Sequence, residues 1–303
     1  MGYVKKILVV DDDIGIRSSI VEFLEEDYDV ESAESGHLAL DMLKKNKYDL
    51  LLSDMQMAPM SGLDLVNKAV KVDPRMKCAL LTGYKVDKYI DLIKQQKIAN
   101  VITKKSPFDF DELSMVIENI LYPETVFGLA RYLNKKAKIN KFEVRTSTDK
   151  TRIILKIIKY FSDYIKVATG TFDVHLILEE LINNALFHGF WDEDGNEKYS
   201  IKNFDVLDPK DEVIVEFGKD NSQIGFSVSD NGGKLTLQKI LETLERQINQ
   251  KGLFDECGRG LYLSRALSSK MVVNIKNNEL TEVIVLITNT QEPVEKPIHI
   301  NVL

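Results

Sequence analysis

Charged and polar side chains stand at the ends of four apolar runs in the first third of the chain. They are Asp11, Asp12, Asp54, Thr82 and Lys104. If these residues converge, the carboxylates repel one another unless a cation is present, and hard oxygen ligands of this kind favour Mg²⁺. With the metal and the lysine neutralising charge, Asp54 could attack a phosphoryl donor and form an aspartyl phosphate, whose oxygens Thr82 could bind.

A second group of polar side chains recurs every fourth residue in the apolar stretch EELINNALFHG, residues 179–189. Glu180, Asn184 and His188 would lie along one face of an α-helix, whose other residues are apolar enough to be buried. Such a stripe indicates either a ligand site or a solvent-facing edge. His188 is the member that most readily fits a capping or packing role instead.

Two glycine motifs indicate which ligand such a stripe would meet. In DNGG, residues 230–233, Asp230 can hydrogen-bond a base, while Gly232 and its neighbour let the backbone approach a ligand closely. In CGRGLYLSRAL, residues 257–267, Gly258 and Gly260 precede an apolar helix, where free N–H groups and the helix dipole attract phosphate. Together with the stripe, these motifs predict a nucleotide site.

The elements that must position the first cluster follow from the hydrophobic pattern of the first 120 residues. Short apolar runs alternate five times with amphipathic stretches, from KILVV at the start to FDELSMVIENIL at the end. This pattern predicts a doubly wound (βα)5 domain with a parallel sheet covered on both faces. The polar cluster then lies at the carboxyl ends of the strands, where such folds bind ligands.

Residues 3–122 resemble the receiver domain of response regulators. The resemblance implies that Asp54 is the phosphoacceptor, Thr82 the switch hydroxyl and Lys104 the conserved-type lysine. It also implies that Mg²⁺ is held by Asp11, Asp12, Asp54 and the backbone of Gln56. Two positions depart from the family pattern: Val101 replaces the usual aromatic switch residue, and Met57-Ala58-Pro59 replaces the usual Met-Pro.

The pattern changes after Phe142. We expect a strand at FEVRTS, a helix over 149–164, the helix that carries the stripe, and strands at DEVIVEFG, QIGFSVSD and EVIVLIT. These elements predict an α+β layer, a mostly antiparallel mixed sheet with helices on one face. Residues 191–211 are interpreted as an insertion, and residues 234–257 as a long lid.

Residues 140–290 resemble the GHKL ATPases, and within them the anti-sigma-factor serine kinases. The resemblance implies ATP and Mg²⁺ as cofactors, with Glu180 as the general base and Asn184 as a metal ligand. The remaining residues that it implies contact the nucleotide: His188, Asp230, Gly232, Gly258, Arg259, Gly260 and Thr281. Lys234 stands where the family's D-x-G-x-G box has its second glycine, as in shorter boxes of the anti-sigma group.

Length and composition set the outer limits. The chain has 303 residues, 44% of them hydrophobic, which is enough for two cores. We expect a receiver domain at 1–122, a linker helix at 123–139 whose apolar side could support a homodimer, and an ATPase domain at 140–303. A net charge of −7 disfavours direct nucleic-acid binding. No run approaches the roughly 18 apolar residues of a membrane span, so we expect a cytoplasmic protein.

These features predict a response regulator whose output is a serine/threonine protein kinase in a partner-switching pathway. Its partners would be an upstream histidine kinase and an anti-sigma-factor antagonist or sigma factor. One alternative is a module that sequesters its partner in an ATP-dependent manner without phosphorylating it. Another is an atypical histidine kinase, which none of the four histidines supports, because none lies in a helical hairpin before the ATPase region.

Overall fold

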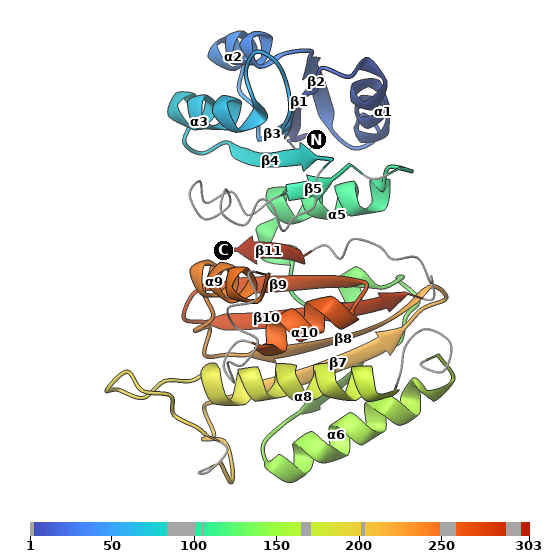
Figure 1. The fold of residues 1–303 in the computed structure, drawn as a ribbon, viewed down its shortest axis with the longest axis vertical. Helices are drawn as coiled ribbons and strands as arrows, with labels where there is room; N and C mark the ends of the chain where they lie inside the picture. Colours follow the sequence, from blue (N-terminus) through green and yellow to red (C-terminus); the bar gives the residue numbers. More distant parts are fainter. Residues whose placement is uncertain are drawn as a thin grey trace. The chain divides into compact units, whose positions relative to one another are not determined.

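The chain divides into two compact units, Met1–Pro123 and Glu124–Leu303 (Figure 1). The structure is a computed structural model, and it describes residues 3–83, 101–104, 106–164, 171–200, 204–248, 259–288 and 298–303. The amphipathic stretch at 86–96 lies outside the described residues. No helix among those described is long and apolar enough to cross a membrane.

The first unit is a parallel five-stranded sheet flanked by helices, as the alternating pattern predicts. The strand order is β2-β1-β3-β4-β5. The strands are β1 (Lys6–Val10), β2 (Asp29–Ala33), β3 (Leu50–Asp54), β4 (Lys77–Thr82) and β5 (Val101–Thr103). The helices are α1 (Ile14–Leu24), α2 (Gly36–Lys45), α3 (Gly62–Val72) and α5 (Phe110–Leu121). Leu50, Leu51 and Leu52 of the central strand are fully buried, because helices cover both faces of the sheet.

The second unit contains a six-stranded mixed sheet in the order β11-β9-β10-β8-β7-β6. Its strands are β6 (Asn140–Glu143), β7 (Val213–Lys219), β8 (Gln223–Asp230), β9 (Lys270–Lys276), β10 (Leu280–Thr288) and β11 (Ile298–Val302). Only β11 and β9 pair in parallel, and the other neighbours are antiparallel. Strands β9 and β11 complete the sheet that the sequence pattern predicts only in part.

Helices cover one face of this sheet (Figure 1). They are α6 (Ser147–Tyr160), α8 (Thr171–His188), α9 (Leu237–Ile248) and α10 (Arg259–Leu267). A capping box between Thr146 and Asp149 starts α6 two residues earlier than the sequence suggests. Helix α9 occupies the first part of the expected lid. The apolar face of α8 is buried, with Ile177, Leu178 and Ile182 fully inaccessible to solvent.

The segment between the two domains differs from the expected linker helix. It forms two short 3-10 helices, η2 (Pro123–Thr125) and η3 (Leu129–Tyr132). Gly128 has a φ of 94°, a conformation that interrupts a continuous α-helix. The apolar residues Val126 and Leu129 are fully buried within the second unit. The apolar side expected to support a dimer is therefore already covered by this chain's own sheet.

Candidate functional site

Lys104 joins the carboxylates of β1 and β3 at the carboxyl end of the first sheet. Its Nζ lies 2.6 Å from Asp11 Oδ2 and 2.7 Å from Asp54 Oδ1. Burial alone would lower the pKa of Lys104, but the hydrogen bonds to both carboxylates outweigh burial and raise it. Burial raises the pKa of Asp54 above its ordinary value, although Lys104 opposes this shift. Asp54 is thus a nearly buried carboxyl held by one cation.

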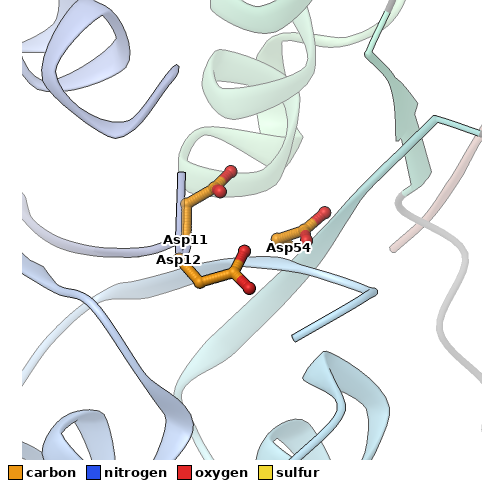
Figure 2. Close-up of side chains that lie close together, drawn as sticks. All are labelled: Asp11, Asp12 and Asp54. Carbon is orange, nitrogen blue, oxygen red and sulfur yellow. The ribbon is translucent and has the colours of Figure 1, made fainter. Parts of the chain in front are cut away.

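Three carboxylates come close enough together to share a metal ion. The side chains of Asp11, Asp12 and Asp54 each offer an oxygen within 4.8 Å of the others (Figure 2). Asp12 is exposed while the other two are buried, so the group opens toward solvent on one side. Oxygen ligands in this number suit Mg²⁺. Asp13 has a different role, since its Oδ1 caps α1 by accepting the N–H groups of Gly15 and Ile16.

The remaining residues predicted for this site lie around Asp54. The Gln56 N–H donates to Asp54 Oδ2 at 3.2 Å, so the loop after β3 is fixed against the carboxyl. Thr82 ends the neighbouring strand β4 and is fully buried, and its carbonyl accepts the Lys104 N–H at 2.6 Å. Gly62 fits tightly, because a Cβ there would stand 1.9 Å from the Asp54 carbonyl oxygen. All the receiver residues singled out from the sequence therefore come together.

The polar stripe of α8 meets the start of α10. An ideal Cβ on Gly260 would stand 2.6 Å from Glu180 Oε2 and 3.1 Å from Asn184 Nδ2. Only a glycine lets the backbone of α10 approach these two side chains so closely. The neighbouring carboxylate of Glu179 points elsewhere and accepts a 2.5 Å hydrogen bond from Lys150 Nζ. A carboxylate, an amide and the N-terminal turn of a helix thus lie side by side.

Asp230 stands at the end of β8, beside the end of α8. Its Oδ1 accepts the N–H groups of Gly232 and Gly233 at 3.1 and 3.0 Å, and the side chain is 5% exposed. Burial raises its pKa to about 7. A Cβ on Gly232 would stand 1.8 Å from the Gly189 carbonyl oxygen, so the DNGG loop contacts the residue that follows α8. Gly189 was not singled out from the sequence, although this glycine directly follows His188, the last residue of the polar stripe.

Thr281 lies directly opposite Asp230 in the pairing of β10 with β8. Directly paired residues project from the same face of a sheet, so both belong to this site. The Thr281 Oγ1 is buried and has no hydrogen-bond partner in the described structure. An unsatisfied buried hydroxyl beside a buried carboxyl is the kind of arrangement that a polar ligand would complete.

The structure describes the remaining predicted nucleotide contacts only in part. His188 Nδ1 lies 2.6 Å from Glu197 Oε1, and both side chains are largely exposed. This pair ties the end of α8 to the segment 191–199, where Trp191 bridges Glu197. Gly258 and the side chain of Arg259 lie outside the described residues, although Arg259 begins α10.

Comparison with known proteins agrees with both halves of this architecture. Residues 7–118 match the response regulator receiver domain, and residues 150–287 match the histidine kinase-like ATPase domain. Sporulation initiation phosphotransferase F of Bacillus subtilis is 33% identical over 119 residues, which are 39% of this chain and 94% of that protein. The chain belongs to the response regulator family.

Further relatives match the receiver alone. The response regulator receiver protein CpdR of Brucella abortus is 31% identical over 118 residues, covering 39% of this response regulator and 97% of CpdR. A solved structure of the chemotaxis protein CheY4 of Vibrio cholerae is 26% identical, with a TM-score of 0.37, and covers 39% of this chain and 100% of that chain. The two family matches together show that this response regulator carries a receiver fused to a histidine kinase-like ATPase domain.

Proposed function

We propose that this response regulator accepts a phosphoryl group on Asp54 and thereby controls an ATP-binding output domain, which acts as a serine/threonine protein kinase of the anti-sigma-factor type. The phosphodonor would be an upstream histidine kinase, and the output partner an anti-sigma-factor antagonist or a sigma factor. The receiver part is supported by the pairing of Lys104 with Asp11 and Asp54. A Mg²⁺ ion held by the three carboxylates would neutralise charge during phosphoryl transfer.

The contact of Gly260 with Glu180 and Asn184 carries the kinase part of the proposal. Phosphoryl transfer requires mainly positioning and charge neutralisation, with a base near the attacking hydroxyl. The turn at Gly260 offers N–H groups for phosphate oxygens, and Asn184 would hold the Mg²⁺ that accompanies the nucleotide. Glu180 is then placed to accept a proton from a serine or threonine hydroxyl. The bond of Glu179 to Lys150 supports Glu180 rather than Glu179 for that role.

Asp230 and Thr281 fit the base of the nucleotide. A carboxylate accepts a hydrogen bond from an exocyclic amino group, and the unsatisfied Thr281 hydroxyl can donate to a ring nitrogen. Gly232 leaves no side chain between the loop and the end of α8. This arrangement favours an adenine nucleotide, and together with the phosphate turn it supports ATP as the ligand.

The histidines favour a hydroxyl acceptor over a histidine acceptor. Between His37 in the receiver and His175 on α8 the sequence contains no histidine. The segment that precedes the ATPase domain therefore offers no histidine for autophosphorylation. His175 itself is exposed on the same helix as Glu180.

The experiment combines the full chain, Mg²⁺ and γ-labelled ATP with proteins that co-purify with the chain. We expect an acid-stable label on a partner's serine or threonine, since phosphoserine survives acid. An acid-labile label on this chain would instead identify a histidine kinase. A tight, ATP-dependent complex in which no protein carries label would identify a sequestering module. Either of the last two results would overturn the kinase assignment.

A further inference from the structure

Residues 126–133, here called the strap, cover the sheet face opposite the helices of the second unit. Their apolar side chains are buried there: Val126 and Leu129 completely, and Leu133 to 6% exposure. The sheet is shaped to receive them. Gly218 on β7 pairs directly with Gly225 on β8, so two side chains are missing at adjacent positions.

The gap left by these two glycines is filled by leucines of the strap. A Cβ on Gly225 would stand 3.0 Å from Leu129 Cδ1, and a Cβ on Gly218 would stand 3.3 Å from Leu133 Cδ1. A Cβ at these positions would also stand 2.9 Å from Leu286 Cδ2 and 2.8 Å from Ile139 Cδ1, so a side chain at either position would crowd the strap and its neighbours. The sheet therefore has a specific receptor for this segment.

Polar side chains of the sheet fix the strap backbone near Gly128. Glu282 Oε2 accepts the Gly128 N–H at 3.0 Å, and Glu216 Oε2 accepts the Leu129 N–H at 3.1 Å. Asn274 Nδ2 donates to the Val126 carbonyl at 2.8 Å and to Glu282 Oε2 at 3.1 Å. These bonds hold the turn at Gly128, whose φ of 94° a side chain would strain.

The same contacts carry a free-energy cost that lowers the net stability of the docked strap. Glu282 is 4% exposed, and none of the ion pairs among the described residues includes it. Burial raises the pKa of Glu282, which the Gly128 N–H and the amide of Asn274 only partly offset. A buried carboxylate without a cation is costly, whereas burial of the leucines is favourable. Release of the strap would return Glu282 to water and so recover part of the free energy that burial of this carboxylate costs.

Strand β10 links this face directly to the nucleotide site. Glu282 contacts the strap, and the preceding residue, Thr281, pairs with Asp230. Successive residues of a strand project from opposite faces. Glu282, which contacts the strap on one face, is therefore the immediate neighbour of Thr281, which lies beside Asp230 on the other. A shift of β10 at Glu282 would therefore also displace Thr281, the adjacent residue of the strand.

The chain also joins the strap to the receiver. Helix α5 ends at Leu121, so only residues 122–125 separate it from Val126. At about 3.6 Å per residue, such a link keeps the start of the strap within roughly 18 Å of the helix end. A change at the end of α5 can therefore reach the strap through this short covalent link.

We propose that the strap is the element through which the receiver regulates the ATP site: its docking on the sheet holds β10 in the position that binds nucleotide, and phosphorylation of Asp54 changes that docking. The inference rests on the proposed ATP-binding function. The state with the strap docked is the one with high nucleotide affinity. Coupling of this kind changes affinity by about 5-fold or more.

Two full-length variants test the proposal in opposite directions. Leu129→Asp puts a charge into the glycine gap and should release the strap, raising hydrogen exchange of residues 126–133 and weakening Mg-ATP binding by about 5-fold or more. Glu282→Gln keeps an acceptor for Gly128 but removes the buried charge, so exchange should slow and Mg-ATP should bind more tightly. Leu155→Asp, at an exposed position of α6, is the matched control.

Calorimetry measures the affinity for Mg-ATP. Hydrogen exchange of residues 126–133 is measured with and without acetyl phosphate. Acetyl phosphate should change strap exchange in the wild-type chain but not in Asp54→Asn. Mg-ATP affinities within twofold of wild type in both strap variants would overturn the inference. Hydrogen exchange of residues 126–133 that is the same with and without acetyl phosphate would also overturn it. Failure of the wild-type chain to bind Mg-ATP would overturn the proposed function itself, which is a distinct result. If Leu129→Asp does not fold, Glu282→Gln still decides.

Discussion

Gly260 packs against Glu180 so closely that an added Cβ would stand 2.6 Å from the Glu180 Oε2. The two residues are 80 positions apart in the sequence, and their contact joins the start of α10 to the polar stripe of α8. The colliding atom is the end of a flexible side chain, so a methyl group at position 260 would displace the carboxylate without breaking the fold.

Gly260→Ala should therefore affect nucleotide chemistry more than stability. We expect Mg-ATP binding to weaken, because the displaced Glu180 and Asn184 no longer face the turn, while the urea midpoint changes little. Calorimetry and urea unfolding of the same preparation measure both. Gly15→Ala in the receiver, where a Cβ meets only Asp13 Oδ1 at 3.3 Å, should leave ATP binding unchanged. Equal ATP affinity in Gly260→Ala would remove this turn from the site.

The adjacent glutamates on α8 provide a matched pair. Glu180→Gln should preserve ATP binding but slow phosphoryl transfer to a partner by ~10²-fold or more, the usual scale of a general base. Glu179→Gln alters the bond to Lys150 and should leave the transfer rate near that of wild type. Single-turnover transfer of labelled phosphate compares them. Similar losses in both variants would contradict the role of Glu180 as the base.

Lys104 balances two buried carboxylates, which gives a prediction about stability. Lys104→Met should destabilise the metal-free chain by about 3 kcal/mol, because Asp11 and Asp54 would remain buried without a cation. Added Mg²⁺ should restore more stability in this variant than in wild type, since the metal replaces the lost charge. Urea titrations with and without MgCl₂ test this. A metal effect no larger than that in wild type would argue against a shared carboxylate site.

Asp54→Asn should abolish labelling of the chain by a small phosphodonor such as labelled acetyl phosphate. ATP binding by the second unit should stay intact, since Asn preserves the size of the side chain and the ATP-site residues belong to other elements. Asp12→Asn serves as a comparison, because that residue would contribute to the metal but not accept the phosphoryl group. Residual acyl phosphate on Asp54→Asn, detected by its lability in base, would assign the acceptor elsewhere.

The raised pKa of Asp230 predicts a pH dependence. The pKa of Asp230 is about 7 in the folded chain, whereas that of an unperturbed aspartate is 3.8, so between these pH values the folded state binds more protons. Its contribution to the unfolding free energy should therefore fall as pH rises from about 4 to 7. ATP affinity should rise over pH 6 to 8, because the ionised carboxylate is a stronger hydrogen-bond acceptor for the adenine amino group than the protonated acid. Asp230→Asn should flatten both slopes relative to wild type, and parallel pH profiles of the two proteins would contradict this.

The local sequence pattern was sufficient to predict both fold classes and much of the receiver site. Short apolar runs alternating with helical patterns of period 3.6 predict the parallel receiver sheet, and strands mixed with amphipathic helices predict the α+β layer of the second unit. The receiver site was predictable as a group, since the carboxyl ends of parallel strands meet at one edge and place Asp11, Asp54 and Lys104 together. The helical spacing of Glu180 and Asn184 likewise follows from the sequence.

Contacts between distant segments were decided only by the tertiary structure. Three acidic residues follow β1, yet Asp13 caps α1 while Asp11 meets Lys104, a division that depends on where the neighbouring elements pack. His188 shares the helical stripe but pairs with Glu197, because a hairpin returns to the end of α8. The apolar segment at 126–133 reads as a connecting helix, whereas the glycine gap formed by Gly218 and Gly225 receives it on the sheet. Periodicity gives the face on which a side chain lies, but what that face meets is set by packing between residues far apart in the chain.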